Sequence, residues 1–432
     1  MFPKGGWESS FFATFGGFSP FMVSSVISAF SMKKLFASLA CVLLFFSAKG
    51  EQRLLVDDRS DSTLLRNVIK KGTILKDFRI NAQVATSAYS IFNDWEHKKT
   101  SFLQALAKME FLGSINDHLS YNFKFNFNSI DKNPFKTTDK ASLMLSRALI
   151  TWKAFKKTSF TIGKQDILLG GHEFNTKNVN VNMYTDFGDA IPSNAVGVSL
   201  EQTLNDNHTL SLQVINNETQ SENEVYYRGF PEEVEETNIP LAASIYWEGN
   251  FFNRCFTTRY SIAGAELAKN RGMYSIYLGN TFKTERFLTY LDILFEREEL
   301  DYKGFISNLQ TLDGRNSTAQ NVDYFAIIFD FDYWLNKKWK VFIKGDYEVS
   351  NVFKSSGTAE KKNDFKAGNY IKSWMGEACV EFFPFTKKLD FRLYLSFTHK
   401  QYYMSDLAKS IGGKNHSNQY IGLGCVCNLA VL

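Results

Sequence analysis

The chain has little proline, little cysteine and no apolar run of the length that a membrane-spanning helix requires. Its 432 residues include 7 prolines and 5 cysteines. The longest nearly apolar stretch runs from Leu35 to Phe46, whereas a helix that crosses a bilayer needs about 20 residues. Four cysteines follow residue 50 (Cys255, Cys379, Cys425 and Cys427), with neither disulfide-framework nor zinc-finger spacing. We expect them to be thiols, although a disulfide between some of them stays open.

The chain also lacks a strong excess of charge and any grouping of histidines. The formal net charge is +4, and residues 1–50 carry four lysines and one glutamate, so the remainder is close to +1. A nearly neutral chain is not expected to bind nucleic acid. The six histidines are scattered and belong to no recognisable hydrolase motif. We therefore expect no catalytic residues, no metal site and no cofactor.

The sequence predicts a secretion signal that begins at residue 32 rather than at the start of the chain. In "MKKLFASLACVLLFFSAKGEQ", starting at Met32, two lysines precede the apolar run, and small residues at 48 and 50 suit signal peptidase. We predict a signal peptide over 32–50, cleavage after Gly50 and a mature chain from Glu51; a lipoprotein signal ending at Cys41 is disfavoured by the short run before it. Residues 1–31 are expected to be a spurious extension, or alternatively a short membrane helix.

Aromatic residues are abundant and alternate with polar residues. The chain has 41 phenylalanines and 19 tyrosines, and in "YNFKFNF" (121–127) every second residue is aromatic. The same period of two returns in "WKVFIKGDYEV" (339–349) and "LDFRLYLSFTHK" (389–400). Alternation of this kind predicts β-strands with one apolar and one polar face.

The connections between these runs indicate how the strands are joined. Short polar segments are expected to be hairpin turns at 113–118, 154–158, 205–207, 249–251, 283–285, 335–338 and 384–388. Longer polar segments are expected to be loops at 91–100, 130–139, 167–190, 218–238, 264–271, 299–319, 351–368 and 402–417. Seven hairpins, a preceding run at 74–90 and a final run "QYIGLGCVCNL" give sixteen strands. The sequence therefore predicts an all-β, sixteen-stranded antiparallel transmembrane β-barrel over 74–432, with short turns and both termini in the periplasm of a Gram-negative outer membrane.

A barrel of this size encloses water, because sixteen strands leave a lumen that side chains do not fill. Residues 51–73 are expected to form a periplasmic segment, which is too short to plug the pore. Assigning the polar face of each strand to the lumen gives pore-lining candidates, with basic residues in the early and last strands and acidic ones between 292 and 381. Opposed walls of unlike charge would orient dipolar solutes, whereas a ladder of ion pairs would give no selectivity. The candidates are Arg79, Lys108, Lys124, Arg147, Lys153, Arg259, Asp292, Glu296, Asp330, Lys340, Lys344, Asp346, Glu377, Glu381, Arg392 and Lys400.

The segment "FTIGKQDILLGGHEFNTKNVNVNMYTDFGDAIP" is the most unusual local sequence. Its "IGKQ", "GGHEF" and "MYTDF" resemble the corresponding block of the phosphate-selective porin O and P family, as does the hairpin "LNDNHTLSLQVIN". The resemblance implies a sixteen-stranded, usually trimeric outer-membrane channel whose third loop, here 167–190, folds inward and narrows the pore. Placed in this constriction are Gly163, Lys164, Gln165, Gly170, Gly171, His172, Glu173 and Lys177.

Within that block, the glycines at 170 and 171 are expected to allow positive φ. Lys164, His172 and Glu173 are expected to face solute, with two alternatives: Lys164 and Glu173 pair with each other, and His172 is simply a hydrogen-bonded loop residue. Phosphate selectivity needs clustered Arg or Lys, and the mixed charge of the lumen sets this chain apart from that pattern. So does the C-terminal Leu432, where the resemblance implies an aromatic residue.

The sequence thus predicts an outer-membrane porin for the passive diffusion of small hydrophilic solutes, including anions such as phosphate. It would be embedded in outer-membrane lipid, as a homotrimer if the resemblance holds. Two other functions remain open on the same fold. One is a channel specific for a sugar or an organic acid, and the other is a structural or adhesive barrel whose long loops bind a partner.

Overall fold

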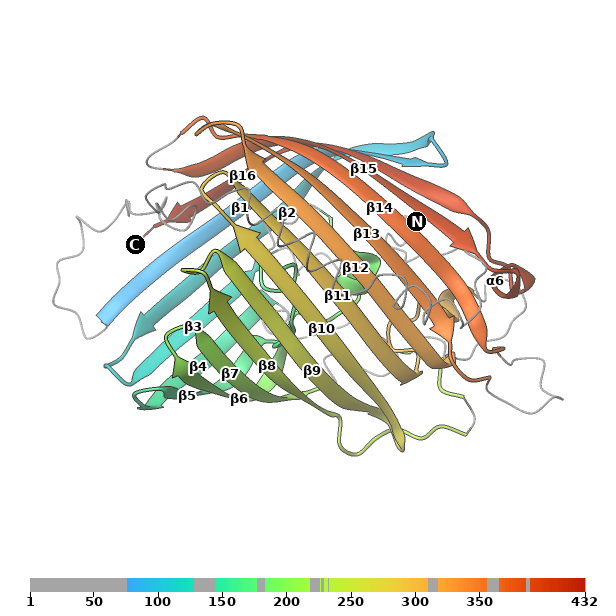
Figure 1. The fold of residues 1–432 in the computed structure, drawn as a ribbon, viewed down its shortest axis with the longest axis horizontal. Helices are drawn as coiled ribbons and strands as arrows, with labels where there is room; N and C mark the ends of the chain where they lie inside the picture. The colour runs from blue at the N-terminus through green and yellow to red at the C-terminus, as the bar shows by residue number, and fades with distance from the viewer. Residues whose placement is uncertain are drawn as a thin grey trace, which may run out of the picture.

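The described part of the chain is a closed antiparallel barrel of sixteen strands, each paired with its neighbours in sequence and closed by β1 against β16 (Figure 1). The computed structural model describes residues 76–127, 144–176, 183–217, 226, 229–231, 233–309, 318–355, 365–385 and 389–431. Its strands are β1 (Lys76–Asn93), β2 (Glu96–Ser114), β3 (Leu119–Asn126), β4 (Leu145–Phe155), β5 (Thr158–Asp166), β6 (Asn194–Asn205), β7 (His208–Asn216), β8 (Leu241–Phe251), β9 (Phe256–Ala268), β10 (Arg271–Lys283), β11 (Phe287–Leu300), β12 (Gln320–Trp334), β13 (Trp339–Val352), β14 (Gly368–Phe382), β15 (Asp390–Met404) and β16 (His416–Ala430). The predicted fold class and strand number are confirmed.

Side-chain alternation follows the sequence pattern. On β3, Phe123 faces outward and is 39% exposed, while Lys124 on the opposite face lies between Glu110 of β2 and Arg147 of β4. On β9, Ile262 faces outward at 60% exposure. Apolar residues therefore cover the outside of the barrel, where a bilayer replaces the second sheet of a soluble sandwich. No helix among the described residues is long and apolar enough to cross a membrane.

Most of the predicted hairpin turns are observed, but three connections differ from the expectation. Residues 249–251 belong to β8, and the turn lies at 252–255, where three consecutive residues have positive φ. The expected loops at 91–100 and 264–271 are instead two-residue turns at 94–95 and 269–270, with the strands continuing on both sides. Positive φ at Asp94, Trp95 and Asn270 lets the chain reverse this tightly.

The remaining loops emerge from the same end as these two tight turns, which is opposite to the end where β1 starts and β16 stops. The signal peptide, the periplasmic segment 51–73 and residues 74 and 75 of the expected barrel lie outside the described residues, as does Leu432. The first described residue is Lys76, at the start of β1. No disulfide joins the four cysteines of the described chain.

An apolar cluster occupies part of the inside of the barrel. It joins inward residues of β10–β13, such as Tyr277, Leu294 and Tyr324, to Leu169 and Phe187 from the connection between β5 and β6. Phe305, Ile306 and Leu309, from the connection between β11 and β12 that holds the 3₁₀ turn η3 (Ser307–Leu309), complete it. Folded-in loops therefore fill one side of the lumen.

Candidate functional site

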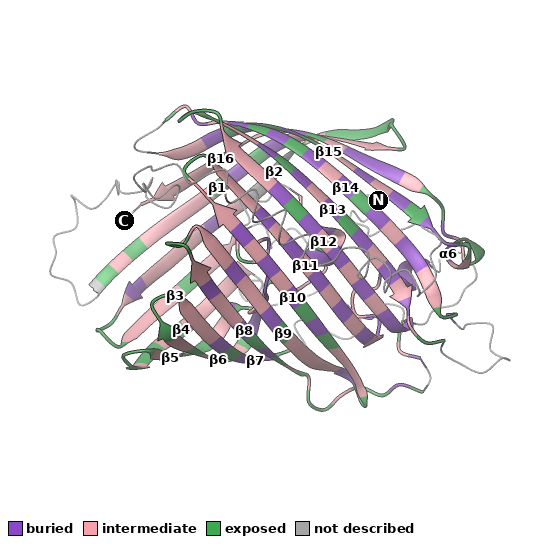
Figure 2. Ribbon diagram, viewed as in Figure 1, coloured by how far each residue is buried: buried purple, intermediate pink, exposed green. Residues whose placement is uncertain are grey.

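The sixteen pore-lining candidates all occupy the inward register of their strands. They lie on β1–β4, on β9 and on β11–β15, on the face opposite to the exposed apolar residues. Their exposure divides them, as Figure 2 shows: inward positions of β10–β15 are mostly buried, whereas those of β1–β6 are mostly half-buried or exposed. The buried candidates are Lys108, Asp292, Glu296, Asp330, Lys344, Asp346, Glu377, Glu381, Arg392 and Lys400.

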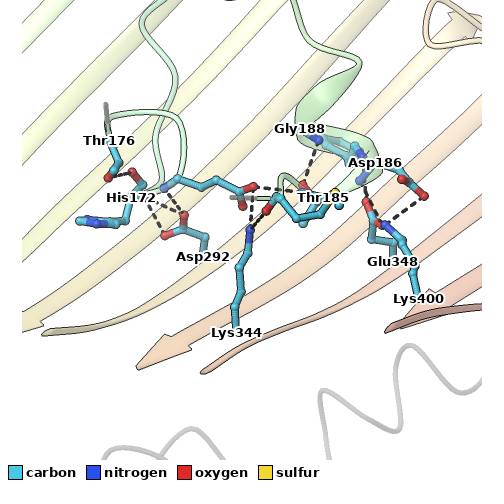
Figure 3. Close-up of polar contacts among 12 residues, drawn as sticks. His172, Thr176, Thr185, Asp186, Gly188, Asp292, Lys344, Glu348 and Lys400 are labelled. Atoms are coloured by element: carbon cyan, nitrogen blue, oxygen red, sulfur yellow. Dashed lines mark hydrogen bonds and ion pairs between the residues drawn. The ribbon is translucent and has the colours of Figure 1, made fainter. Parts of the chain in front are cut away.

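The connection between β5 and β6, residues 167–193, is called loop 3 here and folds into the barrel against the β9–β15 wall. Its root is fixed by Asp292 of β11, which is fully buried. The Asp292 carboxylate accepts the backbone N–H of His172 at 2.7 and 2.8 Å and that of Glu173 at 2.9 Å (Figure 3). Gly170 N–H donates to Ser261 Oγ at 2.7 Å. The wall of the barrel thus satisfies the polar backbone of the loop.

Two glycines of the loop and one of the wall make this approach possible. Gly171 has a φ of +93°, as expected, but Gly170 does not have positive φ. A Cβ on Gly170 would lie 2.5 Å from the carbonyl oxygen of Tyr277. A Cβ on Gly279 of β10 would lie 2.3 Å from the Gly171 Cα. Gly170 and Gly279 are therefore required for close packing rather than for backbone freedom.

Glu173 forms the second attachment of loop 3. Its side chain is fully buried, and Oε1 accepts from Lys344 Nζ at 3.1 Å and from Thr185 N–H at 3.0 Å. Lys344 also donates to the Met183 carbonyl at 2.6 Å. Glu173 thus ties the two described parts of the loop to β13. The expectations that Glu173 faces solute or pairs with Lys164 are both wrong, because Glu173 is paired with a different lysine and has no exposed surface.

The third attachment is at the short helix α4 (Asp186–Asp189). Glu348 of β13 accepts the Phe187 N–H at 2.8 Å and the ammonium of Lys400 at 2.6 Å. Lys400 also contacts the Asp186 carboxylate at 3.0 Å, and Tyr402 donates to it. Figure 3 shows Lys344 and Lys400 pointing toward the loop from β13 and β15, which lie on either side of β14. Loop 3 is therefore bound along its described length by buried, charged hydrogen bonds.

Lys164 does not belong to this constriction. It pairs with Ala148 on one side and Val196 on the other, in the outward register shared with the exposed Ile162 and Val198. Gln165 does point inward, where it is buried and accepts from Ser199 at 2.7 Å. The expectation for Lys164 is therefore wrong, and Lys177 lies outside the described residues.

His172 is a hydrogen-bonded loop residue rather than an exposed charge. Its Nδ1 lies 3.0 Å from Thr281 Oγ1, and its ring stacks on Tyr290 with 4.5 Å between centroids. Burial, assisted by the positive charges of Arg259 and Lys283, lowers the pKa of His172 to about 3. The imidazole is thus neutral at ordinary pH and adds no charge to the lumen.

Ion pairs neutralise much of the β9–β15 wall. Lys340 contacts Asp332 at 3.2 Å and Glu381 at 2.7 Å, and Glu381 also forms an ion pair with Arg392 at 2.7 Å. Nearer the other end, Lys303 lies between Glu296 and Glu298. The alternative of an ion-pair ladder therefore describes part of this wall. Asp330 and Asp346 belong to none of these ion pairs but are buried, so the acidic candidates of the wall have little surface open to the lumen.

The β1–β4 wall has more accessible basic groups. Arg147 contacts Glu110 at 3.1 Å and also pairs with Asp166, and its side chain retains 18% exposure. Lys124 is the cross-strand neighbour of both Glu110 and Arg147, and Lys108 lies on the same face of β2. Arg79 and Lys153, near the ends of β1 and β4 opposite to loop 3, are exposed. This group, called the basic wall, consists of Arg79, Lys108, Lys124, Arg147 and Lys153.

The sequence did not single out several residues that hold loop 3. Thr185 and Asp186 lie in the quoted block without an expected role, and Glu348 is one of the polar residues that alternate in "WKVFIKGDYEV". Gly279 gave a usable signal, since a glycine inside a strand often marks the close approach of another backbone. In the described chain, no group of three or more His, Cys, Asp or Glu residues has metal-binding geometry.

The closed barrel, the folded-in loop and the partly charged lumen define an outer-membrane porin. The family model of phosphate-selective porin O and P matches residues 79–414, and the chain belongs to this family. It therefore forms a channel for passive diffusion in the outer membrane of a Gram-negative bacterium.

Solved structures share the fold at low sequence identity. The outer membrane channel DcaP of Acinetobacter baumannii matches with a TM-score of 0.54 and 11% identity, covering 82% of this chain and 97% of that one. An anion-selective porin from Comamonas acidovorans matches with a TM-score of 0.52 and 8% identity, covering 82% and 99%. OmpF of Salmonella typhi, solved with daunomycin, gives 0.50 and 9%, covering 82% and 97%. None of the curated proteins compared with the chain matches it.

Proposed function

We propose that the porin passes small anions, phosphate among them, in preference to cations, without any catalysed step. The observation that carries this proposal is the unequal exposure of the two walls. Acidic residues of the β9–β15 wall, such as Asp292, Glu348 and Glu381, are buried under loop 3 or within ion pairs. A charge in contact with water sets the local concentration of mobile ions more strongly than a buried and compensated one.

Apart from the buried Lys108, the residues of the basic wall are basic groups of the lumen that a solute can contact. Arg147 presents a planar guanidinium that suits phosphate oxygens, and Lys124 is its cross-strand neighbour. Glu110 reduces the positive charge there but is itself held by Asn122 at 2.9 Å and Asn81 at 3.3 Å. The family and the anion selectivity named for the Comamonas porin agree with this preference.

Reversal potentials test the proposal. In a planar bilayer with a KCl gradient, we expect the purified channel to be at least about twofold more permeable to chloride than to potassium. Added phosphate should then reduce the chloride current if it shares the path. A reversal potential whose sign shows potassium to be more permeable than chloride would overturn the anion preference. Liposome swelling measures the entry of uncharged sugars. If one sugar enters much faster than others of similar size, a sugar-specific channel is favoured instead.

We also propose that the porin is a homotrimer whose subunits meet at the outer face of β4–β6. A lysine in the apolar band is costly where lipid surrounds it, yet Lys164 lies half-buried among the exposed Ile162, Val196 and Val198. A neighbouring subunit would give its ammonium a polar partner. Native mass spectrometry of the solubilised protein should give three times the chain mass, and a monomer would contradict this proposal.

A further inference from the structure

The short turns at the periplasmic end of the barrel carry basic residues directly beyond a girdle of aromatic residues. Trp152 and Phe160, at the ends of β4 and β5, stack with their ring centroids 5.8 Å apart. Trp339 and Phe382, at the ends of β13 and β14, lie 4.6 Å apart. Girdles of aromatic residues flank the apolar band of outer-membrane barrels at the level of the lipid headgroups. This girdle therefore locates the surface of the inner leaflet on the barrel.

Basic residues extend past the girdle in four of the turns. Lys156 and Lys157 follow Phe155, which is 72% exposed, and Lys337 and Lys338 lie between Leu335 and Trp339. Arg254 and Arg286 are exposed in the turns between β8 and β9 and between β10 and β11. Among the described turn residues at this end, the exposed acidic residues are Asp117, Asp206 and Glu285. These six basic residues are called the basic rim.

The charges of the rim are compensated less than those at the opposite end of the barrel, where some of the exposed lysines are paired. At the extracellular end, three exposed lysines have carboxylate partners: Lys98 with Glu96, Lys269 with Glu235, and Lys409 with Asp406 at 3.7 Å. Other exposed lysines there, such as Lys99 and Lys414, form no ion pair with the described residues. In the described structure the rim residues form no ion pair. Their contacts are with backbone, as where Lys157 Nζ reaches the Leu204 carbonyl at 3.3 Å and Arg254 the Asp206 carbonyl at 3.2 Å.

We propose that the basic rim binds anionic phospholipid headgroups in the inner leaflet of the outer membrane, with phosphatidylglycerol as the lipid class. The position of the rim beside the girdle favours a lipid over a soluble partner. The lysines that follow the exposed Phe155 and Leu335 lie close to the level of the lipid phosphates. Uncompensated ammonium and guanidinium groups attract anionic headgroups additively along a surface. The rim would hold an annulus enriched in such lipids and fix the depth of the barrel in the membrane.

The test uses the full chain reconstituted in phosphatidylcholine vesicles with spin-labelled phosphatidylglycerol or spin-labelled phosphatidylcholine. Electron paramagnetic resonance measures the fraction of each label that is motionally restricted at the protein. We expect phosphatidylglycerol to be favoured by about threefold at low salt and less at high salt. Two double variants, K156Q/K157Q and K337Q/K338Q, should each reduce this preference, and their combination should bring it close to one.

The matched control is K98Q/K99Q, which removes two exposed lysines from the extracellular end of β2 and should leave the preference unchanged. Unchanged mobility of unheated protein on denaturing gels shows that each variant still folds into a barrel. The proposal is overturned if the wild-type channel shows no preference, if the combined rim variant keeps it, or if the control loses as much as the rim variants. None of these results would bear on the anion preference of the pore, which is measured separately by reversal potentials.

Discussion

Asp292→Ala should increase the fluctuations of the single-channel current and raise the mean conductance. Asp292 is fully buried and accepts the N–H groups of His172 and Glu173, with distances of 2.7–2.9 Å. Removing the carboxylate leaves both donors without their acceptor, at a cost of about 1–3 kcal/mol for each unsatisfied group. The docked form of loop 3 would lose several kcal/mol, enough to populate detached forms. Single-channel recording at fixed voltage measures both the noise and the mean current.

Asp292→Asn is the matched control. Its amide oxygen keeps an acceptor in nearly the same place without the charge, so its recordings should lie between those of the wild type and of Asp292→Ala. Since Glu348 holds the α4 end independently, adding Glu348→Gln to Asp292→Ala should raise the noise further. If the alanine variant has the same quiet current as the wild type, loop 3 is held by its apolar contacts, through Leu169 and Phe187, rather than by these carboxylates.

Reversing charge on the basic wall should reverse ion preference. Lys124→Glu together with Arg147→Glu replaces two positive groups by two negative ones beside Glu110, where Arg147 is still 18% exposed to the lumen. Mobile ions respond to the sum of nearby charges. We expect the permeability ratio of chloride to potassium to fall by about fivefold or more, to below one. Reversal potentials in a KCl gradient measure this ratio.

The control for this reversal makes the same charge change away from the lumen. Lys99→Glu alters an exposed residue at the outer end of β2 and should shift the ratio far less than the basic-wall variant. A second comparison, Lys344→Glu, concerns a buried lysine bound to Glu173; it should damage loop 3 and raise current noise before it changes selectivity. If the basic-wall variant stays anion-preferring, another part of the chain sets the selectivity.

The barrel itself could be predicted from the sequence because its strands follow from the alternation of apolar and polar residues over a few positions. The period of two in "YNFKFNF" is enough to place Phe123 outside and Lys124 inside. Tight turns were harder to locate. Asn270 readily adopts positive φ and gave a usable signal. Trp95 did not, because a bulky residue rarely has a φ of +66° and here stacks on His399 at 5.4 Å.

The site was only partly predictable, for two different reasons. Lys164 has the same parity as Phe160 and Ile162, so simple alternation would have placed it outside; following the family block instead gave the wrong face. The attachment of α4 could not have been found in this way. Glu348 and Phe187 are 161 residues apart, and nothing near either residue in the sequence indicates the other.

The described parts of loop 3 lie against β9–β15, so the two sides of the barrel have different roles. On the side of β9–β15 the inward residues are buried and bonded to loop 3, so we expect substitutions there to reduce stability or rigidity. On the side of β1–β6 the inward residues are mostly half-buried or exposed, so we expect charges there to be exchanged at a smaller cost in stability. Related channels would therefore change their ion selectivity through a few substitutions on β1–β6, while the attachment of loop 3 to β9–β15 keeps the size of the pore the same.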